Sequence, residues 1–343
     1  MTWKLQTVAT PKKPGEFEII RRFFTPLAAR EPGAFALGDD AAVLPVPPDR
    51  RLVITADAVV CGVHFLASDP PDSVAVKLLG VNLSDLASMG AEPLAYTVTA
   101  ALPEDLDEAW LAAFAGGLGE AQDRYGLTLV GGDTVGTPGP LSLSLCALGL
   151  VEPEAELRRS GAREGDRIYV SGTVGNAALG LRILKGRLDG LPDAETRWLV
   201  DRYRRPRPRV ALGRRLRGLV HAAIDVSDGV VADLAHICEM SGVCARLRAD
   251  RVPVSAQARR ALDEGAVSVA DLLVGGDDYE LLFTASPDNA AVLAELSDEL
   301  ACPLTEIGEI VAPRTEEGDR RAVLVVDGED RVLDVGGGGF RHF

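Results

Sequence analysis

The stretch Leu37-Gly38-Asp39-Asp40-Ala41-Ala42-Val43 places two adjacent aspartates between a glycine and small apolar residues. The paired charges do not suit a buried strand, and the apolar residues that follow do not suit a solvated loop. Similar acidic joints recur at Thr55-Ala56-Asp57, Asn82-Leu83-Ser84-Asp85, Gly131-Gly132-Asp133-Thr134, Asp225-Val226-Ser227-Asp228-Gly229 and Gly275-Gly276-Asp277-Asp278. Carboxylates placed repeatedly at the joints of apolar segments predict one shared site for divalent cations, and an enzyme built on that site.

A purely structural interpretation of each aspartate is a helix cap or an Asx turn, which is the usual role of a single Asp at a turn. Seven aspartates in comparable positions are harder to explain in that way. No histidine or cysteine accompanies the cluster, so its chemistry favours Mg²⁺ or Mn²⁺ over Zn²⁺. The spacing does not fit the calcium-binding EF-hand loop.

The totals describe an ordinary globular chain with an acidic balance. Its 343 residues are enough for two domains, and 47% are hydrophobic while 25% are charged. The net charge of −15 argues against general affinity for nucleic acid or for an anionic membrane surface. A phosphate substrate stays compatible with that charge if metal ions lie between the two sets of anions.

The cysteines and the first residues predict a location. Five scattered cysteines without a C-x-x-C pair are typical of reduced thiols. The N-terminal residues lack an apolar signal core, and the longest apolar stretch, residues 141–151, is too short to span a bilayer. We therefore expect a soluble, cytoplasmic protein.

Strand and helix signals alternate along the chain, which predicts an α/β protein of two domains. We expect a flexible arm at residues 1–14, an N-terminal domain at 15–152 and a C-terminal domain at 153–343. Expected elements include a helix over 16–24, a strand over 51–55 with Asp57 at its carboxyl end, and a helix over 73–89 capped by Asp72. A Gly-x-x-Gly turn at 172–175 suits either an anion cradle or simple tight packing.

Several common catalytic signatures are missing from the sequence. We find no lysine-bearing P-loop, no H-R-D or D-F-G kinase motif and no G-x-S-x-G nucleophile elbow. If the protein handles ATP, metal ions must supply the charge that a P-loop lysine supplies elsewhere. We assign no catalytic nucleophile.

The acidic motifs as a set resemble the thiamine-monophosphate kinase family. The resemblance covers about residues 15–343 and is carried by Gly38-Asp39-Asp40-Ala41-Ala42, residues 82–90, Gly131-Gly132-Asp133-Thr134, residues 225–229 and residues 275–281. It implies phosphorylation of thiamine monophosphate by ATP, with several Mg²⁺ ions. It also implies a homodimer in which the N-terminal mixed sheets of two subunits form a barrel, each with a C-terminal α/β domain packed against it.

The same resemblance implies roles for individual residues. The metal-binding set is Asp40, Thr55, Ala56, Asp57, Asp85, Asp133, Asp225 and Asp228, with Ala56 acting through its backbone. The ATP contacts are Gly132, Asp133, Arg159 and Ser227, and the substrate contacts are His64, Asp277 and Phe340. Asp277 stands where the family usually has Glu, which keeps the charge but shortens the reach by one methylene.

Two other functions stay open at this point. The chain could be another ATP-dependent enzyme of the same superfamily, similar to aminoimidazole ribonucleotide synthetase, although its motifs match less well around residues 275–281. It could also be a non-catalytic protein that binds nucleotide or divalent metal. ATP consumption that depends on thiamine monophosphate separates these alternatives.

Overall fold

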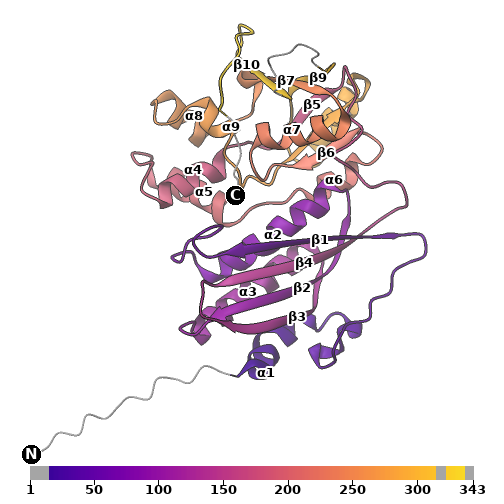
Figure 1. Ribbon diagram of the computed structural model, residues 1–343, viewed down its shortest axis with the longest axis vertical. Helices are drawn as coiled ribbons and strands as arrows, with labels where there is room; N and C mark the ends of the chain where they lie inside the picture. Colours follow the sequence, from indigo (N-terminus) through magenta and orange to yellow (C-terminus); the bar gives the residue numbers. More distant parts are fainter. Residues whose placement is uncertain (1–14, 314–321, 337–343) are drawn as a thin grey trace, which may run out of the picture.

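The computed structural model describes residues 15–313 and 322–336, and the arm expected at 1–14 lies outside them. Two sheets organise the described chain, one in each half (Figure 1). The first has the strand order β1-β4-β2-β3, and the second has the order β10-β7-β9-β5-β8-β6. Each sheet contains one parallel pair among antiparallel ones, which confirms the mixed α/β class.

The first half is a sheet with helices on one face. After α1 (Glu16–Ile19) and three short helical turns ending at Leu37, the strands are β1 (Arg51–Val60), β2 (Glu92–Pro103), β3 (Thr128–Thr137) and β4 (Ser142–Val151). The helices α2 (Pro71–Ser88) and α3 (Glu108–Tyr125) lie side by side on the same face of this sheet (Figure 1). The other face carries exposed apolar side chains such as Ile54 and Val135.

The second half follows directly and packs on the first (Figure 1). Its strands are β5 (Arg167–Ser171), β6 (Ala222–Asp225), β7 (Cys244–Arg248), β8 (Leu281–Ala285), β9 (Leu304–Val311) and β10 (Val323–Val326). Its helices are α4 (Asn176–Leu184), α5 (Asp193–Arg204), α6 (Val210–Leu216), α7 (Val230–Ser241), α8 (Ala256–Asp263), α9 (Val269–Leu273) and α10 (Ala290–Glu299).

Helix α2 is the element that joins the two halves. It is buried on nearly every side, because it packs on β1 and β4 below and on α5, α6 and β6 above. At Gly213 of α6 a Cβ would lie 2.0 Å from the carbonyl oxygen of Ala87, so only glycine allows this close crossing. One apolar core runs from the first sheet through α2 to Leu281 and Phe283 of β8.

Three expected elements differ from the structure. β1 continues past Asp57 to Val60, so Asp57 lies inside the strand and not at its carboxyl end. α2 begins at Pro71 with Pro70 as its N-cap, and Asp72 lies in the first turn, where it pairs with Arg205 of the second half. The helix expected over 16–24 becomes a π-helical turn after residue 19, and Phe17 is 80% exposed instead of packed.

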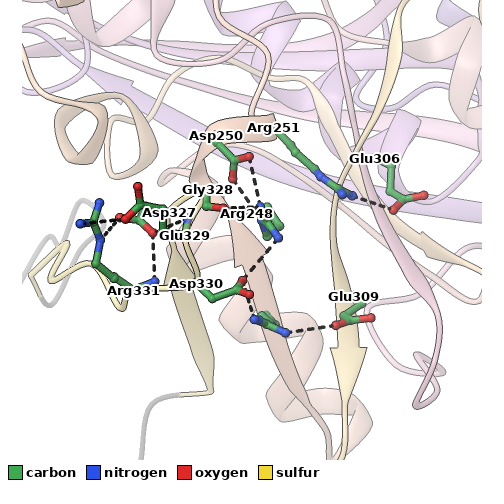
Figure 2. A network of polar contacts seen from close by, with 11 residues as sticks. Arg248, Asp250, Arg251, Glu306, Glu309, Asp327, Gly328, Glu329, Asp330 and Arg331 are labelled. Atoms are coloured by element: carbon green, nitrogen blue, oxygen red, sulfur yellow. Dashed lines mark hydrogen bonds and ion pairs between the residues drawn. The ribbon is translucent and has the colours of Figure 1, made fainter.

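The β7–β9 side of the second sheet is covered by ion pairs (Figure 2). Arg246 lies 2.6 Å from Asp330 and Arg248 lies 3.1 Å from Asp250. Arg251 faces Glu306 at 3.3 Å. These side chains are partly exposed, so each pair adds little stability, about 0–1 kcal/mol. The two charges within each pair cancel, and because the side chains are partly exposed, this face of the sheet is in contact with water.

Two remaining expectations concern cysteines and membranes. All five cysteines, which fall within the described ranges, are free thiols. Across residues 15–313 and 322–336, no helix is both long and apolar enough to cross a bilayer.

Candidate functional site

A cavity with a volume of about 820 Å³ lies between the two halves of the described chain. Its walls come from β1 and α2 on one side, and from the turn after β6 and the loop at 275–279 on the other. Eight predicted site residues line it: Asp57, His64, Asp85, Arg159, Asp225, Ser227, Asp228 and Asp277. Residues from both halves of the sequence therefore share one cavity.

The contact between β1 and α2 arranges the acids of the first half. The Thr55 hydroxyl donates a hydrogen bond to the Asp85 carboxylate, and the Asp57 amide donates to Asn82 Oδ1 at 3.0 Å. Thr55 and Asp57 are two apart on a strand, whereas Asn82 and Asp85 are three apart on a helix, so each pair shares one face. Asn82 and Asp85 therefore both face β1.

The carboxylates in this cavity repel one another. Burial and the neighbouring Asp85 together raise the pKa of Asp57 to about 6. Burial also raises the pKa of Asp85, although the hydrogen bond from Thr55 and the charge of Arg159 oppose that change. The pKa of Asp225 rises to about 7 through burial and the charge of Asp85. A bound cation would relieve this repulsion, as the crowded sequence motifs predict.

Asp233 holds the turn that carries Ser227 and Asp228. Its Oδ2 accepts hydrogen bonds from the backbone amides of Ser227, Asp228 and Gly229 at 3.0, 3.1 and 3.1 Å. Burial and the charge of Asp225 raise the pKa of Asp233 to about 8. The sequence analysis did not single out Asp233. Its signal is an acid in the first turn of a helix that follows a glycine-terminated acidic motif.

The predicted site residues His64 and Arg159 both line the cavity. His64 Nδ1 accepts a hydrogen bond from the Val60 amide at 3.0 Å, and the His64 carbonyl accepts one from Tyr203 at 3.1 Å. Arg159 is exposed and interacts electrostatically with Asp85 and Asp225. His64 is thus fixed by the fold, while Arg159 is a positive charge at the edge of an acidic cavity.

A second cavity of about 390 Å³ holds the remaining acidic motifs. Asp39 and Asp40 line it from one side, and residues 131–134 of β3 line it from the other. At Gly132 a Cβ would lie 1.9 Å from the Val98 carbonyl oxygen, because β2 and β3 shift register after Tyr96. The second glycine of this motif is therefore required by the approach of two strands, whereas a Cβ at Gly131 would meet only the Thr97 methyl at 3.6 Å.

The two cavities lie at opposite edges of the first sheet. Asp133 on β3 pairs with Thr99 on β2, which pairs with Ser144 on β4, which pairs with Ala58 on β1. Three strand spacings separate the edges, a distance of about 14 Å. A single chain therefore does not bring Asp133 to Asp57, and the predicted metal set is divided between two places.

The structure adds a limit on metal binding. In the part of the chain that the structure describes, no three Asp, Glu, His or Cys side chains are grouped closely enough to hold a metal ion. The donors near Asp57 and Asp85 are all oxygens, which fits Mg²⁺, an ion that usually keeps several waters and takes substrate phosphates as ligands. The residues present fit a cation whose coordination is completed by ligands from the substrate.

Two of the predicted residues that the structure describes line neither cavity. Thr55 acts only through its hydrogen bond to Asp85, and Ala56 is exposed on β1. Phe340 lies outside the described residues. The cavity also has a lining residue that the sequence analysis missed, Lys77. A lone lysine in the apolar helix segment 74–81 is a signal that could have found it.

The Gly-x-x-Gly turn at 172–175 is occupied by the chain itself. The buried carboxylate of Asp278 accepts hydrogen bonds from the amides of Gly175 and Ala177, at the N-terminus of α4. Of the two interpretations of this turn, the structure supports tight packing, because the amides that would cradle an external anion already have an internal one.

Family comparisons agree with this arrangement. Residues 38–151 match the family model of the AIR synthase related protein N-terminal domain, and residues 163–320 match that of the C-terminal domain. The thiamine-monophosphate kinase of Salmonella typhimurium is 42% identical over 299 residues, which cover 87% of this chain and 91% of the relative.

Solved structures give the same result. The crystal structure of thiamine-monophosphate kinase from Stenotrophomonas maltophilia is 43% identical, with a TM-score of 0.77 over 84% of this chain and 89% of that chain. A structure of AaThiL complexed with AMPPCP and TMP is 28% identical, with a TM-score of 0.75 over 92% of this chain and 98% of that chain. The resemblance inferred from the acidic motifs is confirmed, and the chain belongs to the thiamine-monophosphate kinase family.

Proposed function

We propose that the protein transfers the γ-phosphoryl group of ATP to the phosphate of thiamine monophosphate, giving thiamine diphosphate and ADP. The observation that carries the proposal is the large cavity between the halves, where four aspartates face Arg159, His64 and Asp277. The wall that these four aspartates form would repel polyanionic substrates unless cations lie between them. Basic side chains elsewhere in the lining, Lys77, Arg182, Lys185 and Arg187, add positive charge to the same cavity. A relative solved with AMPPCP and TMP supports the same pair of substrates.

The proposed transfer is direct and in line. The acceptor is already an anionic oxygen, so the reaction needs no strong general base and no protein nucleophile. What it needs is alignment of two polyanions and stabilisation of charge on the transferred group. In this proposal Gly132, Asp133, Arg159 and Ser227 contact ATP, while His64, Asp277 and Phe340 contact the thiamine end.

Mg²⁺ is the proposed cofactor. The residues that would hold it are Asp40, Thr55, Ala56, Asp57, Asp85, Asp133, Asp225 and Asp228. When bound, the ions would neutralise the phosphates and the developing charge of the transfer. The raised pKa values of Asp57 and Asp225 support this set, because burial and the neighbouring Asp85 disfavour their charged forms and a bound cation would favour them.

A homodimer is part of the proposal because one chain holds the two acidic groups at opposite sheet edges. Joining two copies of the first sheet edge to edge into a barrel would bring β1 of one copy beside β3 of the other. The face opposite α2 and α3 would then be enclosed, including Ile54, which is 61% exposed, and Val135, which is 44% exposed. We propose the cytoplasm as the place of the reaction.

A coupled assay of ADP release tests the function. Purified protein, ATP, Mg²⁺ and thiamine monophosphate should release ADP and form thiamine diphosphate in equal amounts. Substrates of the aminoimidazole pathway should give no release. ADP release with those substrates alone would favour the sister enzyme. No release with either would favour a non-catalytic nucleotide-binding protein.

A further inference from the structure

The lining of the large cavity contains a buried lysine, Lys77, beside Asp277. Lys77 lies in the middle of α2, and its side chain is 3% exposed. Its Nζ donates a hydrogen bond to Asp277 Oδ2 at 2.9 Å and lies 3.7 Å from the centroid of the Tyr203 ring. An ammonium group buried to this extent is stable only with such partners, so its position is narrowly defined.

Asp277 is held from both sides. Its Oδ1 accepts a hydrogen bond from the Tyr279 hydroxyl at 3.0 Å, while Oδ2 accepts from Lys77. The backbone is held as well, because the amides of Asp277 and Tyr279 donate to the carbonyls of Ser227 and Val226, each at 2.8 Å. Both residues adopt positive φ, 70° and 52°, a conformation that is costly for non-glycine residues and that surrounding contacts must maintain.

Tyr203 links this pair to the other predicted substrate residue. Its ring lies beside the Lys77 ammonium, and its hydroxyl donates to the carbonyl of His64 at 3.1 Å. The contacts therefore run without a break from His64 through Tyr203 and Lys77 to Asp277. They connect α2 of the first half with α5 and the 275–280 loop of the second.

We infer that Lys77 is a positioning residue that fixes the Asp277 carboxylate, and through Tyr203 the His64 backbone, in the geometry that selects the substrate of this cavity. The inference rests on the proposed function, in which Asp277 and His64 contact the thiamine end. The length of the Asp277 side chain supports this role for Lys77. A carboxylate one methylene shorter than Glu has less freedom to reach a ligand, so its place depends more on the groups that hold it.

The test is a double-mutant cycle read as a split between KM and kcat. Lys77→Met keeps an unbranched apolar side chain that matches lysine as far as Cε, and it removes the ammonium. We expect it to raise the KM for thiamine monophosphate about tenfold, with the KM for ATP and kcat changed less than about twofold. Asp277→Asn should raise the same KM. In the Asp277→Asn background, adding Lys77→Met should have little further effect, because Lys77 acts through Asp277.

Controls separate positioning from folding and from net charge. The double variant removes both charges, so it stays foldable even where Lys77→Met alone leaves a partly buried carboxylate unpaired. Arg215→Met removes one positive charge from an exposed ion pair with Glu299 and should leave both KM values unchanged. Thermal midpoints of all variants, and dissociation constants for thiamine monophosphate from calorimetry, complete the set.

The outcomes are distinct. Wild-type protein that neither binds nor phosphorylates thiamine monophosphate overturns the proposed function. Active wild-type protein with a Lys77→Met variant of unchanged KM and dissociation constant overturns the role of Lys77 alone, whatever the thermal midpoint does. If Lys77→Met lowers kcat equally in the wild-type chain and in the Asp277→Asn variant, positioning is also overturned, since Lys77 would then act directly on the transferred group.

Discussion

Asp57 is the residue where stability and function conflict most clearly. It lies inside β1, next to Asp85, and in the absence of a cation its pKa is about 6. The sequence predicted that this aspartate belongs to a metal site, because it follows a β-rich run and has no histidine nearby. Repulsion among the clustered acids was predictable, but the identity of the neighbour, Asp85, was not, because it depends on how β1 packs across α2.

Replacing Asp57 by Asn should stabilise the cation-free protein while it removes activity. Between the ordinary pKa of 3.8 and about 6, the folded state binds more protons than the unfolded chain, so stability falls as pH rises through this range. Asn abolishes that loss. At pH 8 with a chelator we expect a gain of about 1–2 kcal/mol in the free energy of unfolding, reduced from the full shift by solvent screening.

Urea unfolding at pH 8 and at pH 4, together with the ADP-release assay, checks this prediction. At pH 4 the variant should be little more stable than wild type, because most of the stability that wild-type protein loses through Asp57 is lost only at higher pH. Turnover with Mg²⁺ should fall by orders of magnitude. The exposed Asp105 provides the matched control, since Asp105→Asn should change neither property. A loss of stability at pH 8, or near-normal turnover, would contradict the assignment.

At the scale of elements, the sequence predicted the alternation of strands and helices, including β1 and α2, but not where the strands end. β1 and β3 both continue through motifs that suggested breaks, at Asp57 and at Gly131-Gly132-Asp133. Both strands lie at sheet edges, where a strand needs only one partner and tolerates glycine and charge. The identity of an edge depends on strand order, which a local sequence pattern does not contain.

The N-terminus of α4 carries a prediction of its own. Asp278 is buried and is the acceptor for the amides of Gly175 and Ala177. Asp278→Ala should lower the free energy of unfolding by about 2–4 kcal/mol, because it leaves two buried donors without a partner. Asp278→Asn keeps one carbonyl oxygen and should cost about half as much. Urea unfolding of both variants measures these free energies. Equal stability of Asp278→Ala and wild type would contradict the role of Asp278 in holding the N-terminus of α4.

For the whole molecule, sequence motifs identified the acids that line cavities, but not that these acids are divided between two separate cavities. Asp57, Asp85, Asp225 and Asp228 come together between the halves, as predicted. Asp40 and Asp133 lie in a separate cavity at the far edge of the first sheet. Motif reasoning treats all acids alike, whereas strand order places β1 and β3 three strands apart. Lys77 was missed for a related reason, since its partners belong to the other half of the chain.

The assembly prediction concerns the face of the first sheet opposite α2 and α3. If two sheets close into a barrel, Ile54 moves from 61% exposed to an enclosed apolar environment. Ile54→Glu would then bury a carboxylate without a partner, at a cost of several kcal/mol for each copy. We expect wild-type protein to have the mass of two chains by light scattering, and Ile54→Glu to have the mass of one.

Activity should follow assembly, because the proposal needs β1 and β3 from different copies. Ile54→Glu should therefore lose ADP release at least about tenfold, although Ile54 belongs to neither cavity. Val292→Glu on α10 is the matched control: this valine is 43% exposed and lies outside the sheet, so mass and activity should stay unchanged. A fully active single chain, from wild type or from Ile54→Glu, would mean that the acids at the two sheet edges act independently, and that Asp133 does not complete the site at Asp57.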